Sequence, residues 1–458
     1  MPSGTQMIVG LIIGVAALVY LILRTKIHAF LALIIAAALV GLIGGMGPKD
    51  VATAITTGFG NTLASIGIVI GFGVMMGRVL EVSGAAERMA KTFLRYLGRD
   101  KEEWALAATG YVVSIPIFCD SGFVILAPIA KALSSRTGKS VVALGVSLAV
   151  GLVATHHAVP PTPGPLAVAG IFGVDVGLMI LWGLVFAAPV TIAGVIYAKW
   201  LGRRIVQVPT PDGLGWQRLP AGSKPAQVAE TVAASDDEAR LPGTAISFAP
   251  VVVPVILILL NTVLTAAKAA GPVANFLVFL GNPVIAVAIG LIIAVYGLMG
   301  QAPRKDVLRR CEEGVASAGI IILVTGAGGS LGQVLRSSGV GDFIAQQIAN
   351  SGLPAVILPF AVATLVRLVQ GSGTVAMITS ASITAPILAN LNVNPVLAAQ
   401  AAAMGAMVFS YFNDSYFWVV NRLLGIEDVK EQIMTWSVPT TIGWAVSFLT
   451  IVVASFFF

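Results

Sequence analysis

Residues 71–90 read GFGVMMGRVLEVSGAAERMA, and residues 326–345 read GAGGSLGQVLRSSGVGDFIA. The two stretches are copies of one motif, because Gly71, Gly73, Gly77, Val79, Leu80, Ser83, Gly84 and Ala90 recur as Gly326, Gly328, Gly332, Val334, Leu335, Ser338, Gly339 and Ala345. Further along each copy, CDSGFV (119–124) corresponds to QGSGTV (370–375), and ATHHAVPP (154–161) corresponds to FSYFNDSY (409–416). A duplicated hydrophobic chain with Gly- and Pro-broken segments at matching places is typical of secondary transporters.

The composition is that of a membrane protein. The chain is 57% hydrophobic and 10% charged, with a mean hydropathy of +0.94, whereas soluble domains carry about 25% charged residues. Apolar runs near the ~20 residues that cross a bilayer occur at 7–23, 28–45, 178–198, 246–266, 283–299 and 437–458. We therefore predict an all-α polytopic membrane protein in the bacterial cytoplasmic membrane. A soluble helical core is excluded because the chain lacks the charged surface that it would need.

The chain divides into two halves joined by one long hydrophilic stretch. We predict a first transmembrane repeat at 1–202, a cytoplasmic linker at 203–244 and a second, inverted transmembrane repeat at 245–458. Cys119 and Cys311 lie in different halves and outside any CxxC pair, so neither a disulfide framework nor a metal site is predicted, and no cofactor is expected. The net charge of +6 is interpreted as loop charge and not as a nucleic-acid surface.

Loop charges orient the chain. The positive side chains gather in a few loops, which we place in the cytoplasm: 24–26, 88–101, 136–139, 199–204, 304–310 and 430. All of these loops can lie in the cytoplasm only if residues 105–135 and 353–390 enter and leave the membrane on the same side, as re-entrant hairpins. Each half then makes three spans, a hairpin, a broken span and a final span. Each half then crosses the membrane five times. Because five is odd, the second repeat is inverted relative to the first, and both termini lie outside. Two full spans in place of each hairpin would give the same parity, so that alternative stays open.

Polar tips favour the hairpins. Residues 119–122 and 370–374 interrupt long apolar runs, and consecutive polar backbone groups cannot face lipid. They can line a wet cavity, where the start of the returning half-helix suits an anion. We therefore expect a small organic anion to bind near the tips, at Ser121, Gly122, Ser372, Gly373 and Thr374. The alternative is that Gly and Ser here only permit close helix packing.

Two spans are broken at matching places. Residues 155–165 hold four prolines that cannot continue a helix, and residues 410–415 are the corresponding break in the second half. Ionisable residues at membrane depth are functional candidates, and they are Asp120, His156, His157, Arg367 and Asp414. We assign Thr155, His156, Arg367 and Asn413 to substrate binding, and Asp120 and Asp414 to proton coupling. Structural alternatives are a helix cap for Asp414, a counter-charge for Arg367 and packing for the histidines, above all for His157.

These motifs resemble those of the gluconate:proton symporter (gluconate permease) family. The resemblance rests on GFGxxxGxxLxxSG at 71–84, Asp120-Ser121-Gly122-Phe123-Val124 with Pro128, the Pro-rich 155–165, Arg367 with 371–376, and Asn413-Asp414 with Phe417-Trp418. It covers nearly the whole chain. It implies the ion transporter superfamily, with inverted repeats and two re-entrant hairpins, and sugar acids or related hydroxy or amino acids as substrates. The chain departs from the family at Tyr411, where the family usually has His, at Tyr416, where it has Gly, and at Ser121, where Val is commoner.

The sequence thus predicts a secondary active transporter that imports gluconate or a related small sugar acid or hydroxy acid by proton symport. The alternative is a carrier for another small organic anion or amino acid, such as D-serine, D-glycerate or citrate, with proton or sodium coupling. A membrane enzyme is not expected, because HExxH-type spacing and an acidic cluster are missing from the sequence. The expected partners are the substrate, protons and the lipid bilayer. A homo-oligomer stays open.

Overall fold

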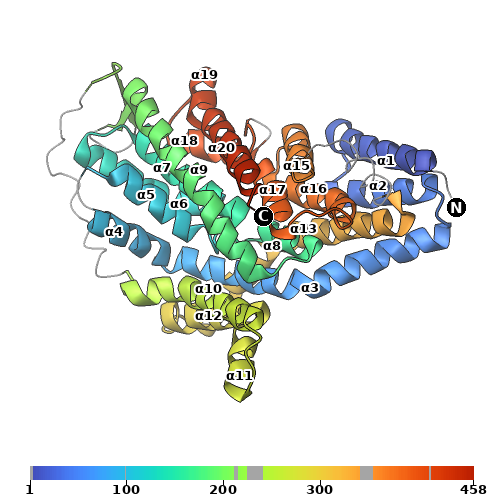
Figure 1. Cartoon of the computed structure of the whole chain (residues 1–458). Helices are drawn as coiled ribbons and strands as arrows, with labels where there is room; N and C mark the ends of the chain where they lie inside the picture. The colour runs from blue at the N-terminus through green and yellow to red at the C-terminus, as the bar shows by residue number, and fades with distance from the viewer. Residues whose placement is uncertain are drawn as a thin grey trace.

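The computed structural model describes residues 4–97, 100–210, 215–223, 241–340, 354–411 and 414–457, and these are almost entirely helical (Figure 1). The first half contains α1 (Gly4–Arg24), α2 (Ala29–Ile43), α3 (Pro48–Val82), α4 (Ala85–Leu97), α5 (Glu102–Val113), α6 (Cys119–Thr137), α7 (Val141–Ala158), α8 (Pro163–Phe172) and α9 (Val176–Arg204). Between the halves lie β1 (Val206–Pro209) and β2 (Trp216–Leu219). The second half contains α10 (Thr244–Ala266), α11 (Pro272–Leu280), α12 (Pro283–Leu298), α13 (Arg304–Ser338), α15 (Ile357–Gln370), α16 (Gly373–Leu388), α17 (Pro395–Gly405), α18 (Ser415–Leu423), α19 (Val429–Gln432), the π-helix η2 (Ile433–Ser437) and α20 (Val438–Ala454).

Several helices have the length and polarity of membrane spans. Within the described residues, Val141–Phe172, α9, α10 and Val429–Ala454 are long and apolar enough to cross a bilayer, and counting two bent segments raises the number to six. One of the bent segments joins α11 to α12 at an angle of 65°. Shorter apolar helices, including α2, α16 and α17, are too short to cross on their own. These elements agree with the predicted polytopic all-α protein.

The two copies of the repeated motif have the same local structure. Residues 71–82 of the first copy and 326–338 of the second lie in the C-terminal parts of the 35-residue helices α3 and α13. Gly84 and Gly339 follow these helices with φ of +78° and +74°, in the left-handed region that glycine adopts without strain. Ser83 donates to Leu80 O and Ser338 donates to Leu335 O, at 3.3 and 3.0 Å. The sequence duplication is therefore also a duplication of helix ends.

Helices α3 and α13 pack side by side and run antiparallel (Figure 1). Near one end of the pair, Ser330 Oγ donates to Ile55 O at 2.8 Å. Near the other end, Arg78 and Glu313 form an ion pair with Nη2 and Oε2 2.8 Å apart. Close contact between them needs glycine, since a Cβ on Gly58 would lie 2.4 Å from Gly329 O. The duplicated helices thus point in opposite directions.

Two pairs of helices occupy the segments predicted as hairpins. In the first pair, α5 and α6 are 12 and 19 residues long and are joined by residues 114–118. This connection passes very close to α3, because a Cβ on Gly77 would lie 2.4 Å from Pro116 O. The predicted tip at 119–122 is not irregular. It forms the first turn of α6, because Pro116 places the break a few residues earlier.

The second pair matches its predicted tip more closely. Helix α15 ends at Gly371, which has φ of +84°. Ser372 then caps α16, and its side chain accepts a hydrogen bond from Val375 N at 3.3 Å. Helices also end at both predicted breaks: α7 ends at Ala158 and α8 begins at Pro163, while α17 ends at Gly405 and α18 begins at Ser415.

A cluster of charged residues connects the start of α5 to the segment between α6 and α7. Lys139 Nζ, just before α7, lies 2.8 Å from a carboxylate oxygen of both Glu102 and Glu103, at the start of α5. Burial raises the pKa of Glu102, but the hydrogen bond from Lys139 and the Lys139 charge outweigh it, so the pKa lies below its usual value. The cluster fixes the end of α6 that lies away from the break.

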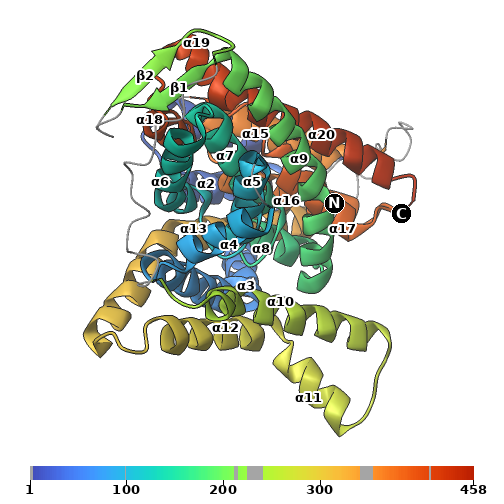
Figure 2. The ribbon, with the colours of Figure 1, turned by 90° about the vertical axis from the view of Figure 1, so that its left-hand side faces the viewer.

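The described part of the segment between the halves contains an ordered hairpin. Strands β1 and β2 pair antiparallel, with Val206 opposite Leu219, and lie beside α19 (Figure 2). Gln207 Nε2 donates to Gly425 O at 2.9 Å, and Arg218 forms an ion pair with Glu431. The hairpin therefore contacts the turn that follows α18 in the second half.

Candidate functional site

Polar groups from both halves meet at the helix breaks. The start of α6 contributes Asp120 and the end of α7 contributes His156 and His157. The end of α15 contributes Arg367, and Asp414 lies at the start of α18. His156, His157 and Arg367 are all buried, with 7%, 5% and 5% of their surface exposed. The structure thus brings together all five ionisable residues that the sequence singled out.

Arg367 and Asp414 form a buried ion pair. Arg367 Nη2 lies 2.6 Å from Asp414 Oδ2, and the two side chains are 5% and 13% exposed. Ser410 Oγ donates to the same oxygen, while Asp414 Oδ1 accepts from Tyr416 N at 3.2 Å and so caps α18. Among the described residues, Arg367 Nε and Nη1 have no hydrogen-bond partner. A buried guanidinium with two unused donors is suited to a further anion.

The two histidines also present unused ring nitrogens. His157 Nδ1 lies 3.1 Å from Val153 O, but within the described part of the chain its Nε2 has no partner. This atom lies against the tip between α15 and α16, because a Cβ on Gly373 would be 2.3 Å from it. His156 Nδ1 likewise has no partner there, and its ring packs against Phe118 with centroids 5.8 Å apart. His156 interacts electrostatically with Asp414, and His157 with Arg367.

Asp120 faces the break of the other half. Ser415 Oγ donates to Asp120 Oδ1 at 3.1 Å, and Cys119 Sγ lies 3.6 Å from Asp120 Oδ2. Because Ser415 directly follows Asp414 in the chain, the two carboxylates belong to one polar cluster and repel each other. Nearby, the rings of Phe123 and Tyr416 meet edge to face, with centroids 6.0 Å apart. The start of α6 is therefore fixed against α18.

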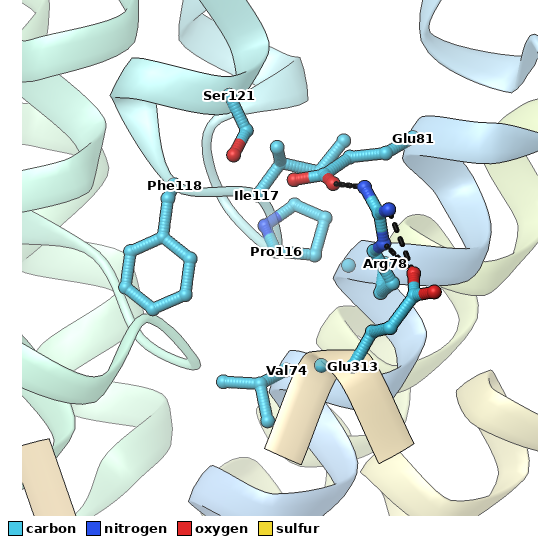
Figure 3. A pocket seen from close by; sticks show the side chains of 10 residues that line it. Val74, Arg78, Glu81, Pro116, Ile117, Phe118, Ser121 and Glu313 are labelled. Atoms are coloured by element: carbon cyan, nitrogen blue, oxygen red, sulfur yellow. Dashed lines mark hydrogen bonds and ion pairs between the residues drawn. The ribbon is translucent and has the colours of Figure 1, made fainter. Parts of the chain in front are cut away.

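Ser121, next to Asp120, faces a separate cavity of about 250 Å³. The cavity lies between α3, the connection before α6 and the start of α13. Figure 3 shows the guanidinium of Arg78 between the carboxylates of Glu81 and Glu313, with the Ser121 hydroxyl turned toward the same space. The first turn of α6 thus presents Ser121 to this cavity and Asp120 to the Asp414 cluster.

The remaining predicted site residues have varied positions. Thr155 Oγ1 donates to Gly151 O of its own helix at 3.3 Å, and a Cβ on Gly122 would lie 2.8 Å from Leu152. Both residues therefore have structural roles in this conformation. Thr374 of α16 lies next to Gly164 of α8, since a Cβ on Gly164 would be 3.5 Å from Thr374 Cγ2. Ser372 caps α16. Asn413 lies outside the described residues.

Sequence reasoning missed two members of the cluster. His157 was singled out with packing as the favoured alternative, and in the structure its Nε2 faces the second tip. Ser410 and Ser415 were not assigned, although they donate to the carboxylates of Asp414 and Asp120. Both serines flank Asp414 in the second break, and this proximity was the available signal. Within the described residues, no group of three His, Cys, Asp or Glu side chains could hold a metal ion.

Comparison with known proteins identifies the family. A sequence profile of GntP family permeases matches residues 6–457. The chain belongs to the GntP permease family. This GntP permease is 52% identical to an uncharacterized permease of Haemophilus influenzae, over 98% of this chain and 92% of the relative. It is 32% identical to a gluconate permease of Pseudomonas aeruginosa, over 99% of both chains.

The fold is that of a solved membrane transporter. The structure of the efflux pump MtrF from Neisseria gonorrhoeae superposes on this GntP permease with a TM-score of 0.66 and 14% identity, over 96% of this chain and 97% of the pump. The predicted family and the predicted polytopic helical transporter are therefore confirmed. The protein is a transporter and not an enzyme, and it is a multi-pass protein of the bacterial cytoplasmic membrane.

Proposed function

We propose that this GntP permease imports gluconate or a related small sugar acid or hydroxy acid together with a proton. The observation that carries the proposal is Arg367, a buried guanidinium at a helix break with Nε and Nη1 unpaired among the described residues. Arg holds carboxylates through several directed hydrogen bonds. The substrate carboxylate binds this guanidinium, and the nitrogens of His156 and His157 bind the substrate hydroxyl groups. The relatives named as gluconate permeases support this substrate class.

The proton is carried by Asp120 and Asp414. Two partly buried carboxylates that repel each other cannot both stay ionised cheaply when a third carboxylate binds. Asp120 takes up the proton, and Asp414 is the second member of the pair. In the same proposal, 1–202 and 245–458 form inverted repeats with the linker in the cytoplasm and both termini outside. The antiparallel packing of α3 and α13, which carry the duplicated motif, supports this inversion.

A transport panel tests this function. Purified protein in proteoliposomes is assayed for uptake of radiolabelled gluconate, D-glycerate, D-serine and citrate, under an imposed proton gradient or an imposed sodium gradient. We expect gluconate or D-glycerate to accumulate with the proton gradient alone. Accumulation of citrate or D-serine in their place, or accumulation driven only by sodium, would favour the alternative carrier over the sugar-acid symporter.

A further inference from the structure

We infer that Asp414 occupies the place of the substrate carboxylate on Arg367, and that substrate replaces it only after Asp414 takes up the coupled proton. This inference rests on the proposed function and adds the mechanism by which substrate and proton are linked. In the structure, Asp414 Oδ2 lies 2.6 Å from Arg367 Nη2. The guanidinium therefore already holds one carboxylate, which belongs to the protein itself.

The count of charges explains why substrate and proton bind together. With the ion pair intact, Arg367 and Asp414 sum to zero. If a substrate carboxylate joined them alone, two carboxylates would share one buried guanidinium. If a proton alone neutralised Asp414, Arg367 would be left as an unpaired buried cation. Both states are costly in a site screened from water. When anion and proton bind together, the sum returns to zero, and each promotes binding of the other.

The hydrogen bonds around Asp414 allow the exchange. Ser410 Oγ donates to Asp414 Oδ2, the oxygen that also contacts Arg367. When a proton adds to Oδ2, the ion pair breaks and the new O–H donates to Ser410 Oγ, since a hydroxyl can also accept. Asp414 Oδ1 keeps its bond to Tyr416 N, so the start of α18 stays capped. Arg367 Nη2 is then released to the substrate carboxylate, and besides the ion pair only the Ser410 hydrogen bond changes, by reversing its direction.

The neighbouring charged and titratable groups are compatible with this exchange. Asp120 and Cys119 face Asp414 from α6, His156 faces it from α7 and Tyr416 from α18, while Arg367 approaches from α15. Asp120 is the other carboxylate in this group, and it accepts a hydrogen bond from Ser415, the residue after Asp414. In this inference Asp120 precedes Asp414 on the path of the proton, because both carboxylates belong to this cluster.

Equilibrium binding tests the exchange. Binding of radiolabelled gluconate to the purified full-length protein is measured from mildly acidic to mildly alkaline pH. For the wild type we expect the Kd to rise about tenfold per pH unit once Asp414 is ionised, because only the protonated fraction binds. Asp414→Asn removes the competing charge and keeps a capping side chain. We expect it to bind about tenfold or more tightly than the wild type at alkaline pH, with little dependence on pH.

Controls separate this result from a folding defect and from a failure of the proposed function. Asp414→Ser is a second neutral capping variant and should behave like Asp414→Asn. Asp428→Asn changes a matched cap at the start of α19, where Asp428 accepts from Glu431 N at 3.0 Å, and should keep the wild-type dependence on pH. Asp120→Asn retains the ion pair and should also keep that dependence.

Three outcomes with the variants overturn the inference. In the first, both neutral Asp414 variants elute as folded protein but lose gluconate binding at every pH. In the second, they keep the wild-type dependence on pH. In the third, Asp120→Asn removes that dependence and the Asp414 variants do not. Wild-type binding without any dependence on pH would reject the exchange and leave the substrate assignment intact. Absence of wild-type binding to gluconate and D-glycerate at all pH values would reject the proposed function as well.

Discussion

Replacing Arg367 with lysine should impair transport severely although the positive charge is kept. In the structure Arg367 Nη2 contacts Asp414 at 2.6 Å, and its Nε and Nη1 have no partner among the described residues. A lysine ammonium is a single point of charge and cannot offer a carboxylate the several directed donors of a guanidinium. The substitution therefore removes at least one charge-assisted hydrogen bond to the substrate.

The size of the effect follows from the strength of such bonds. A hydrogen bond to a charged group contributes about 1.5–3 kcal/mol, which corresponds to about a 10- to 150-fold loss of affinity. Because the side chain is 5% exposed, water cannot replace the missing donor. We expect the KM for gluconate uptake to rise by this factor, or uptake to fall below detection at low substrate concentration.

The assay is initial-rate uptake of radiolabelled gluconate into proteoliposomes with an inward proton gradient. Arg422→Lys is the matched control, because Arg422 lies on α18 with its guanidinium over the Trp418 ring at 5.4 Å. This exposed change should alter uptake by no more than about twofold. If Arg367→Lys transports like the wild type while reaching the membrane in equal amount, Arg367 does not hold the substrate carboxylate.

Three further predictions concern the proton, the topology and the first helix pair. Asp120→Asn should abolish gluconate accumulation driven by an imposed pH gradient but preserve exchange of bound for free substrate, and accumulation by this variant would exclude Asp120 from coupling. A cysteine at Gln217, on β2, should resist an impermeant maleimide in intact cells beyond the background of the native cysteines and react after permeabilisation; labelling from outside would contradict a cytoplasmic linker. Lys139→Met leaves two buried glutamates without their cation and should lower the free energy of unfolding by about 1–3 kcal/mol, less than for a fully buried pair because Lys139 still touches water. Thermal unfolding in detergent measures this loss. Lys91→Met, which removes a partly exposed pair with Glu87 at 3.0 Å, should cost under about 0.5 kcal/mol; equal losses would show that the Lys139 cluster contributes no more than an exposed ion pair.

The sequence was most informative where a residue type is tied to one backbone geometry. Gly84 and Gly339 signalled matching helix ends, and both have positive φ. Apolar runs predicted the membrane spans because the thickness of the bilayer sets the length of a span. The first tip was displaced from its predicted position, because the small residues Ser121 and Gly122 are tolerated in a helix while Pro116 interrupts it.

Contacts between distant elements could not be predicted. Arg367 and Asp414 lie on different elements, and no periodicity indicates that they pair. Asp120 and Ser415 belong to different halves, so their hydrogen bond depends on how the halves pack. Ionisable character alone singled out the five residues that the structure brings together, because a charge at membrane depth is costly. Which of them pair, and which donors stay unused, is decided by tertiary structure.

The hairpin of β1 and β2 restricts how the molecule can move during a transport cycle. It continues directly from α9, and Gln207 holds the backbone at Gly425. Gly425 is itself constrained, with φ of +69° and the Trp216 ring 2.2 Å from where a Cβ would lie. These contacts couple the end of α9 to the turn after α18. In the proposed transport cycle, alternating exposure of Arg367 and Asp414 would therefore come from displacement of this coupled unit against its neighbours, and not from a hinge between the strands and α18.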